Sequence, residues 1–344
     1  MSSSIDRPPS AVHQQRERET QVRGRTQGEL GADQRQGWTI GLPVWFTGWS
    51  AWSGISMKVL VTGAGGQLAN ELEGRAPLDG DVVSLTEQEL DICDEAAVVA
   101  VVARHQPEWI FNAAAYTAVD RAESEAEIAY RVNRDGAAIL ARAATQTGAK
   151  FVHVSTDFVF DGQTTRAYQP EDPTAPLGVY GASKLAGEKA VIAAAPDALI
   201  VRTAWVYSPW GGNFLKTMLR LFAERGEVRV VADQIGTPTS ASTLADALWG
   251  LAKVGASGVF NCTDAGVASW YDFAQAIAEE AFALGLVGAQ TRVLPIATSD
   301  YPTPAQRPAF SVLDKSRTWA LLGSPAPHWR VAMRDVLVRL KALA

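Results

Sequence analysis

A glycine-rich turn between a short apolar run and a helical pattern constrains the fold of this chain more than any other feature. Residues 58–62 read as a strand, and Gly63-Ala64-Gly65-Gly66-Gln67-Leu68-Ala69 follows it and opens a helix expected over 68–75. Glycine at positions 63 and 66 lets the backbone turn tightly and approach a pyrophosphate at a helix N-terminus. The order of strand, glycine turn and helix predicts a dinucleotide site. The alternative is a tight turn without a ligand.

The same alternation continues along the chain and predicts a parallel sheet. Residues 82–85, 109–112 and 151–155 are short apolar runs, and a helical pattern covers residues 124–147. Repeats of this kind form βαβ units, so we expect an α/β, Rossmann-type doubly wound sheet. Ligands of such sheets bind at the carboxyl ends of the strands.

Besides the glycine turn, two loops at these strand ends are candidates for contact with the cofactor. Asp91 and Ile92 lie in the loop after the second strand, where an acid holds an adenosine. No Lys or Arg follows that strand, so these residues do not favour NADP over NAD. Ala113, Ala114 and Ala115 are small residues at a point where the backbone is expected to pass a flat cofactor.

A tyrosine and a lysine four residues apart form a candidate acid–base pair. Tyr180 and Lys184 follow a loop containing two prolines, residues 173–179, and lie on one face of the helix that begins there. A phenol has an ordinary pKa of about 10, and a cation nearby lowers the pKa. Taken alone, the pair is also compatible with an ordinary helix surface.

The C-terminal part of the chain is less regular and predicts a second, smaller α/β lobe. Helical patterns cover residues 241–252, 269–284 and 331–340. Arg307 lies in a loop held by Pro302, Pro304 and Pro308. Arginine on a rigid loop suits a phosphate, although an ordinary ion pair explains it equally well. We assign residues 57–205, with parts of 228–260, to the dinucleotide domain and residues 206–344 mainly to a substrate lobe.

Residues 1–56 differ in composition from the rest. Ser, Gln, Arg and Glu dominate up to Gln36, a composition that predicts disorder. Residues 37–56 contain four tryptophans and no charge, but glycines, serines and Pro43 make them a poor membrane anchor. Because Met57 directly precedes the first strand, our hypothesis is that residues 1–56 derive from an upstream start codon.

Charge and cysteine content narrow the class of partner. The chain has 344 residues and a net charge of −6, without a basic run interleaved with aromatics, which argues against nucleic acid. Cys93 and Cys262 are far apart and form no metal or disulfide motif, which fits a reducing cytoplasm.

Several motifs together resemble the extended short-chain dehydrogenase/reductases and, within them, the dTDP-4-dehydrorhamnose reductase family. Besides the glycine turn and the Tyr180/Lys184 pair, they are residues 112–120 (NAAAYTAVD), 155–157 (STD), 202–207 (RTAWVY), 233–239 (DQIGTPT), 269–274 (SWYDFA) and 301–308 (YPTPAQRP). The resemblance extends from Met57 almost to the C-terminus.

This resemblance implies NAD(P)H-dependent reduction of the 4-keto group of dTDP-4-dehydro-L-rhamnose to dTDP-L-rhamnose, for cell-surface polysaccharide. It implies NADPH as cofactor, with NADH as an alternative, and a monomer or homodimer. Tyr180 would be the catalytic acid, Lys184 would hold the nicotinamide ribose, and Thr156 would bind the 4-oxygen of the sugar. Asp157 and Trp205 would line the sugar pocket, with Arg307 as a further substrate contact. The implied cofactor contacts are Gly63, Gly66, Gln67, Leu68, Asp91, Ile92, Ala113, Ala114, Ala115, Tyr180 and Lys184.

Two departures from the family pattern bear on the site. Phe158 stands where the family usually has tyrosine, which affects how the substrate is oriented. Some members use magnesium held by carboxylates between subunits, but residues 239–244 contain no carboxylate, so we expect no required metal.

Two other functions remain open at this stage. An epimerase or dehydratase of nucleotide sugars has the same fold, although Phe158 provides no glutamate for a dehydratase. A non-catalytic protein similar to the regulatory subunit of methionine adenosyltransferase is the other, and the presence of both Tyr180 and Lys184 counts against it.

We predict that a chain starting at Met57 folds with the same free energy of unfolding as the full chain, because residues 1–36 offer no apolar face to a core. Denaturant titration of both chains measures this. A loss of stability in the shorter chain would show that the tryptophans between 38 and 52 pack against the folded part.

Overall fold

A six-stranded parallel sheet forms the centre of the fold. The computed structural model describes residues 57–77 and 80–343. The strands lie in the order β2 (Gly80–Leu85), β1 (Met57–Thr62), β3 (Trp109–Asn112), β4 (Lys150–Thr156), β5 (Leu199–Thr203) and β10 (Gly258–Asn261). The chain passes from β1 to β2 on one side and then to β3 on the other, so the switch point lies between β1 and β3. The predicted Rossmann-type α/β sheet is confirmed.

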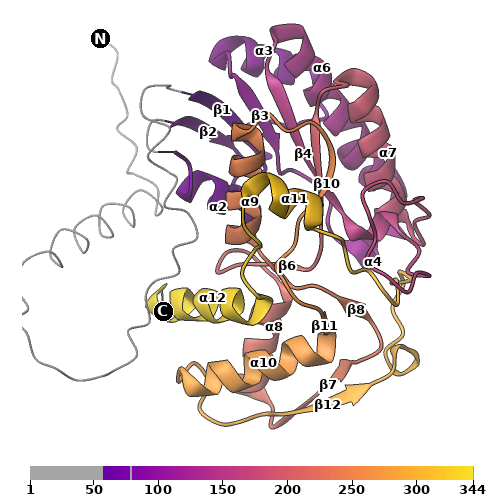
Figure 1. The fold of residues 1–344 in the computed structure, drawn as a ribbon, viewed down its shortest axis with the longest axis vertical. Helices are drawn as coiled ribbons and strands as arrows, with labels where there is room; N and C mark the ends of the chain where they lie inside the picture. The colour runs from indigo at the N-terminus through magenta and orange to yellow at the C-terminus, as the bar shows by residue number, and fades with distance from the viewer. Residues whose placement is uncertain (1–56, 78–79, 344) are drawn as a thin grey trace, which may run out of the picture. The chain divides into compact units, whose positions relative to one another are not determined.

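Helices cover both faces of this sheet (Figure 1). One layer contains α3 (Glu95–His105), α6 (Ala137–Thr147) and α7 (Val179–Ala194), and the other contains α2 (Gln67–Gly74), α9 (Ala241–Lys253) and α11 (Ser316–Leu322). Leu60 of β1, Ile110 of β3 and Ile200 of β5 are fully buried in the core under the first layer. Such apolar strands are typical of a parallel sheet covered on both faces.

The helix expected over residues 124–147 is interrupted by one π-helical segment. The structure has α5 (Ala126–Tyr130), the π-helix η2 (Arg131–Gly136) and then α6, with the short helix α4 (Val119–Ala122) before them. In the π segment, Asn133 accepts a hydrogen bond from the backbone N–H of Tyr116 and donates to Ser183 Oγ. A Cβ at Gly187 of α7 would overlap the Asn133 carbonyl oxygen. These contacts with α7 are tertiary, and an apolar repeat in the sequence does not reveal them.

The C-terminal part of the chain forms a second core. It contains α8 (Phe214–Glu224), α10 (Trp270–Ala283) and α12 (Trp329–Leu343). Fully buried side chains in this core include Leu215, Phe273 and Met333. A capping box between Ser269 and Asp272 starts α10.

Three short strand pairs complete the described part of the chain, together with the 3₁₀ turns η3 (Asp157–Val159) and η4 (Thr298–Asp300). The pairs are β7 (Glu227–Val231) with β12 (Arg292–Ile296), β6 (Val206–Tyr207) with β9 (Thr239–Ser240), and β8 (Ile235–Gly236) with β11 (Ala268–Ser269). Parts of residues 228–260 were assigned to the dinucleotide domain from the sequence. Within this range β10 joins the large sheet, while β7 pairs with β12. The division into two domains stays a prediction, and residues 1–56 lie outside the described part.

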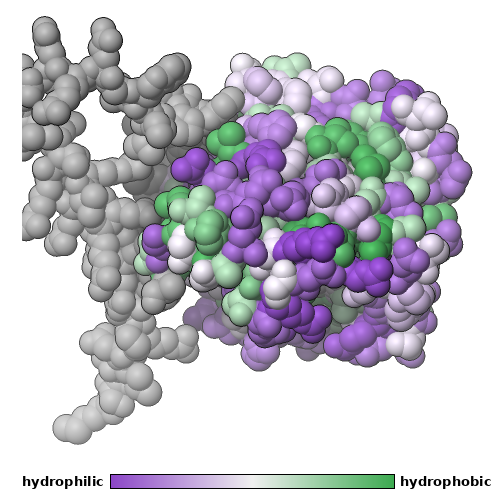
Figure 2. Space-filling view, turned by 90° about the horizontal axis from the view of Figure 1, so that it is seen from below, coloured by the Kyte–Doolittle hydropathy of each residue, from purple (hydrophilic) through white to green (hydrophobic). Residues whose placement is uncertain are grey.

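The surface of the described residues mixes apolar and polar side chains. Figure 2 shows the lower face of Figure 1, with hydrophobic residues in small groups between hydrophilic ones. Single exposed apolar side chains such as Phe282 of α10 and Val338 of α12 are normal for a protein surface. Among residues 57–77 and 80–343, none of the helices has the length and apolarity needed to cross a bilayer.

A buried ion pair joins α7 to the sheet. Arg202 of β5 donates from Nε and Nη2 to the two carboxylate oxygens of Glu188, at 2.9 and 2.7 Å. The Arg202 and Glu188 side chains are 5% and 2% exposed. Ser155 Oγ donates to the same carboxylate, and Arg202 also donates to the Pro170 carbonyl oxygen. The charged groups of Arg202 and Glu188 therefore find their hydrogen-bond partners inside the protein. Removing one of these two side chains would leave the charge of the other buried without a counter-ion.

We predict that Glu188→Gln lowers the free energy of unfolding by about 3 kcal/mol, because the Arg202 charge stays buried without its counter-ion. Glu224→Gln is the control, because its partner Arg220 is 60% exposed and such pairs contribute about 0.5 kcal/mol. Denaturant titration measures both variants. Equal small losses would mean that Arg202 finds another partner.

Candidate functional site

A cleft of about 1080 Å³ lies at the carboxyl ends of the strands. It is lined by residues from both the large sheet and the C-terminal part of the chain. All the residues singled out in the sequence line it, namely Gly63, Gly66, Gln67, Leu68, Asp91, Ile92, Ala113, Ala114, Ala115, Thr156, Asp157, Tyr180, Lys184, Trp205 and Arg307. The structure thus brings them together, while their individual roles stay predictions.

The glycine turn has the geometry of a cradle for a phosphate group. Gly63 has φ +80°, and a Cβ there would lie 2.9 Å from the backbone N and Cα of Ala114. A Cβ on Gly66 would lie 2.9 Å from the Gly63 carbonyl oxygen. Helix α2 begins at the next residue, without a side-chain cap and without an acidic residue in its first turn. Its free N–H groups therefore fit the pyrophosphate of a dinucleotide.

The side chain of Gln67 already has protein partners. Its Oε1 accepts hydrogen bonds from Asn213 Nδ2 at 2.9 Å and from Ser208 Oγ at 3.2 Å. Gln67 therefore ties the start of α2 to the C-terminal part of the chain. The predicted contact of Gln67 with a cofactor is therefore left to its backbone, at the helix N-terminus.

The predicted adenosine contact is built by a local turn. Asp91 Oδ1 accepts from the Cys93 backbone N–H at 2.9 Å, which orders the loop, and Ile92 is buried against Gly136. Glu87 lies two residues after the end of β2 and also lines the cleft. An acidic residue shortly after the second strand is the residue type that binds a ribose hydroxyl. By its position in the sequence, Glu87 is therefore a second candidate for this contact beside Asp91.

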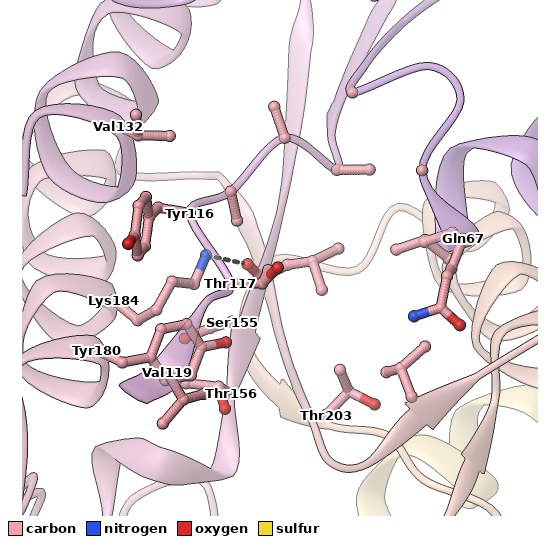
Figure 3. A pocket seen from close by; sticks show the side chains of 18 of the residues that line it. Gln67, Tyr116, Thr117, Val119, Val132, Ser155, Thr156, Tyr180, Lys184 and Thr203 are labelled. Atoms are coloured by element: carbon pink, nitrogen blue, oxygen red, sulfur yellow. Dashed lines mark hydrogen bonds between the residues drawn. The ribbon is translucent and has the colours of Figure 1, made fainter. Parts of the chain in front are cut away.

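Tyr180, Lys184 and Thr156 lie close together on one wall of the cleft (Figure 3). Tyr180 and Lys184 come from the first turns of α7, and Thr156 ends β4. Burial raises the pKa of Tyr180 to about 12, an effect that a hydrogen bond with Thr156 reduces and the nearby Asp157 increases. The phenol therefore keeps its proton near neutral pH.

Lys184 is buried and held by the backbone of β4. Its Nζ donates to the Val154 carbonyl oxygen at 2.7 Å and lies 3.4 Å from His153 Nε2. Burial lowers the pKa of Lys184 to about 8, although the charge of Glu188 acts in the opposite direction. The sequence predicts that Lys184 lowers the pKa of Tyr180, but in this structure burial raises that pKa.

Asp157 and Phe158 follow Thr156 in the η3 turn. Thr156 Oγ1 donates to Asp157 Oδ1 at 3.0 Å, and burial raises the pKa of Asp157 to about 6. The Phe158 ring packs edge-on against Tyr180, with 5.6 Å between ring centroids. A Cβ at Gly181 would overlap the Phe158 carbonyl oxygen, so α7 approaches this turn closely. Phe158 thus supports the Tyr180 ring by packing.

Trp205 is clamped between two other residues. It has φ +48°, which is rare for a residue other than glycine. Its indole stacks on Trp270 with 3.6 Å between centroids and 9° between planes. On the side of Gly236, an added Cβ would lie 2.7 Å from the indole. This immobilises Trp205 as a wall of the cleft.

Arg307 lines the cleft but is held by an ion pair. Its Nη2 donates to Asp120 Oδ2 at 2.9 Å and its Nη1 to Asp120 Oδ1 at 3.1 Å. Thr303 Oγ1 accepts a further bond from Nη1 at 2.6 Å. The ion-pair interpretation of Arg307 therefore holds for this conformation, while a phosphate contact stays a prediction.

Other residues that line the cleft were not among the predicted site residues, although Tyr116 and Thr203 lie in the motifs of residues 112–120 and 202–207. They include Tyr116, Arg121, Glu125, Arg131, Thr203, Phe214 and Trp270. Tyr116 donates its hydroxyl to Glu125 Oε2 at 2.6 Å, next to Arg121. Trp270 was visible in the SWYDFA motif, although not as a lining residue. Within the ranges 57–77 and 80–343, we find no cluster of three or more His, Cys, Asp or Glu side chains that could hold a metal ion.

Comparisons with known proteins match this arrangement. The model of the RmlD substrate binding domain family matches residues 57–342. The chain belongs to this family. A dTDP-4-dehydrorhamnose reductase of Mycobacterium tuberculosis is 46% identical over 294 residues, which cover 83% of this chain and 94% of that protein.

Solved structures of family members agree with the fold. The dTDP-4-dehydrorhamnose reductase of Clostridium acetobutylicum superposes with a TM-score of 0.78 at 38% identity, covering 83% of this chain and all of that one. The dTDP-4-dehydrorhamnose reductase of Bacillus anthracis, solved in complex with NADP, gives a TM-score of 0.78 at 36% identity with the same coverage. The resemblance inferred from the sequence motifs is therefore confirmed.

We predict that Gly236→Ala lowers the free energy of unfolding by about 1–3 kcal/mol, because the new methyl group overlaps the clamped Trp205 indole. In a double variant with Trp205→Leu the loss should be smaller, which a double-mutant cycle measures by denaturant titration. Gly288→Ala is the control, since no atom lies within 4 Å of its added Cβ. Additive losses in the double variant would contradict the clamp.

Proposed function

We propose that this chain is a dTDP-4-dehydrorhamnose reductase, which reduces the 4-keto group of dTDP-4-dehydro-L-rhamnose to give dTDP-L-rhamnose. The observation that carries the proposal is the placement of Tyr180 and Thr156 in the same cleft as the glycine cradle. Relatives of this name share 46% identity in M. tuberculosis and 40% in Escherichia coli. The product belongs to nucleotide-sugar biosynthesis for cell-surface polysaccharide.

The residues of the cleft fit a nicotinamide dinucleotide. We propose that the N-terminus of α2 holds the pyrophosphate, that residues 113–115 lie along the cofactor, and that Lys184 binds the nicotinamide ribose. NADPH is the expected cofactor, in line with the NADP complex of the B. anthracis enzyme, and NADH is the alternative. A bound reduced nicotinamide supplies the hydride.

The chemistry that remains for this chain is to place the keto group and to supply a proton. Thr156 Oγ1 lies beside Tyr180 and can orient the 4-oxygen of the sugar toward the phenol. The Tyr180 O–H bond breaks as the proton moves to the 4-oxygen, where negative charge develops during reduction. Because burial keeps the pKa of Tyr180 high, the protonated form is present across the neutral range.

Asp157, Trp205 and Arg307 complete the proposed substrate contacts. The Trp205 wall limits the space for the sugar, and Asp157 offers a carboxylate at the end of β4. We place the enzyme in the cytoplasm as a monomer or homodimer, with a nucleotide sugar as its partner, no required metal, and neither nucleic acid nor membrane.

The test is oxidation of NADPH or NADH with a panel of nucleotide-linked 4-keto sugars. Tyr180→Phe should bind the cofactor as before and lower turnover by about two to four orders of magnitude, the usual contribution of a positioned general acid. Tyr271→Phe, which removes a phenol outside the cleft, should keep full turnover. Near-normal turnover of the Tyr180 variant would overturn the assignment of the acid.

A second test concerns Arg307. If it binds the diphosphate, Arg307→Ala should weaken the nucleotide-linked substrate by about 1.5–3 kcal/mol, the range for hydrogen bonds to charged groups, without affecting the free sugar. Asp120→Asn is the matched control, because it removes the ion pair and leaves the guanidinium in place. Equal losses in both variants would show that Arg307 supports the loop and does not bind the substrate.

A further inference from the structure

A row of buried polar side chains crosses the sheet beneath Lys184, outside the cleft. Thr62 of β1, Asn112 of β3 and His153 of β4 occupy directly neighbouring positions in the strand register. Each is 1% exposed. Hydrogen bonds join Thr62 Oγ1 to Asn112 Oδ1 at 2.8 Å and Asn112 Nδ2 to His153 Nδ1 at 3.2 Å. The row ends at Lys184 Nζ, 3.4 Å from His153 Nε2.

The orientation of the Asn112 amide follows from a backbone donor. The Ala114 N–H donates to Asn112 Oδ1 at 3.2 Å, and a backbone N–H can only donate. The oxygen must therefore lie on the side of Ala114 and Thr62, so the NH₂ group lies on the side of His153. A flipped amide would place two donors against each other, which a buried site does not tolerate.

This orientation decides the tautomer of His153. Since Asn112 donates to it, His153 Nδ1 must be an acceptor, and the proton of a neutral imidazole is on Nε2. Burial and the charge of Lys184 keep the pKa of His153 well below its ordinary value, so the ring is neutral. The Nε2–H group then faces Lys184 Nζ.

The His153 Nε2–H group interacts differently with the ammonium form and the neutral amine form of Lys184. The ammonium form has three N–H donors and no acceptor, so its contact with Nε2–H is repulsive. The neutral amine has a lone pair that can accept from Nε2–H while Nζ still donates to the Val154 carbonyl oxygen. The row therefore favours the neutral amine in its present position.

We propose that His153, held as the Nε2–H tautomer by Asn112, is a positioning residue that fixes the Lys184 amine against β4 and makes its extra proton easy to lose. This rests on the proposed function only where it concerns turnover. The row itself contacts Lys184, not the cleft. Through this contact, side chains of β1, β3 and β4 influence the charge of Lys184, which contacts the cofactor in the proposed enzyme.

Other ionisable groups lie on the elements packed around Lys184, and of these Glu188 acts on its charge. Glu188 and Tyr180 lie on α7, Asp157 lies in η3, and Tyr116 follows β3. Figure 3 shows Tyr180 and Tyr116 on either side of Lys184. Glu188 favours the ammonium form, although Arg202 neutralises much of its charge. The pKa of Lys184, lowered to about 8 by burial, agrees in direction with the effect of the row.

The tautomer can be measured directly by ¹⁵N NMR of histidine-labelled protein. The chain has four histidines, and a His153→Gln variant assigns the signals of His153. We expect Nδ1 without a proton and Nε2 with one, unchanged from mildly acidic to mildly alkaline pH. A proton on Nδ1, or an imidazolium that titrates in this range, would overturn the proposal.

Asn112→Asp tests the cause. A carboxylate accepts on both sides, so it still accepts from Thr62 and Ala114 but now requires the proton on Nδ1, which leaves Nε2 as an acceptor for the ammonium. The tautomer should invert, and the Lys184 titration, followed by ¹³C NMR of its ε-carbon, should move up by about one pH unit, a tenfold change in proton affinity. Asn70→Asp on α2 adds the same charge away from the row and should change neither signal.

The alkaline limit of turnover should move with the Lys184 titration in Asn112→Asp if the proposed reduction is correct. An inverted tautomer with an unchanged Lys184 titration would overturn the proposal about the row. The expected NMR shifts in a protein that reduces no nucleotide sugar would instead support the row and contradict the proposed function. If Asn112→Asp does not fold, the tautomer of the unmodified protein decides the proposal.

Discussion

The common edge at which β1, β3 and β4 end is the constraint on which the site depends. In a parallel sheet the carboxyl ends of neighbouring strands meet at one edge, and a doubly wound order leaves a crevice at the switch point. The glycine turn after β1, residues 113–115 after β3 and Thr156 at the end of β4 are therefore neighbours although they are far apart in sequence. The register also aligns Thr62, Asn112 and His153 in a row beneath them.

Close packing of α7 on this edge determines the surroundings of Tyr180 and Lys184. Gly181 and Gly187 lack side chains where α7 meets the carbonyl oxygens of Phe158 and Asn133. This approach buries Lys184 and places Tyr180 beside Thr156. Burial then shifts the pKa of both groups, since it raises the pKa of Tyr180 and lowers the pKa of Lys184. The Glu188–Arg202 pair holds the same helix against β5.

Polar contacts join the large sheet to the C-terminal part of the chain around the cleft. Glu71 of α2 is 2% exposed and accepts from Arg339 of α12 at 2.8 Å and from Trp210 Nε1 at 2.9 Å. Gln67 binds Asn213, and Arg307 binds Asp120. Gln67, Asn213 and Arg307 also line the cleft, so these contacts lie next to the proposed substrate and cofactor contacts.

The sequence by itself determined the fold class, the glycine turn and the pairing of Tyr180 with Lys184, because each depends on local order along the chain: strand before turn, turn before helix, and a spacing of four on one helix face. The sequence also placed Arg307 on a rigid loop. It could not decide whether the guanidinium binds a phosphate or forms an ion pair with a protein carboxylate, because this depends on which group lies next to it in the fold. That partner, Asp120, comes from a distant segment and is known only from the fold. The π segment at Asn133, the Trp205 clamp and the row from Thr62 to His153 depend on contacts between segments that no local pattern encodes. Burial, which shifts the pKa values of Tyr180 and Lys184, is likewise a property of packing in three dimensions.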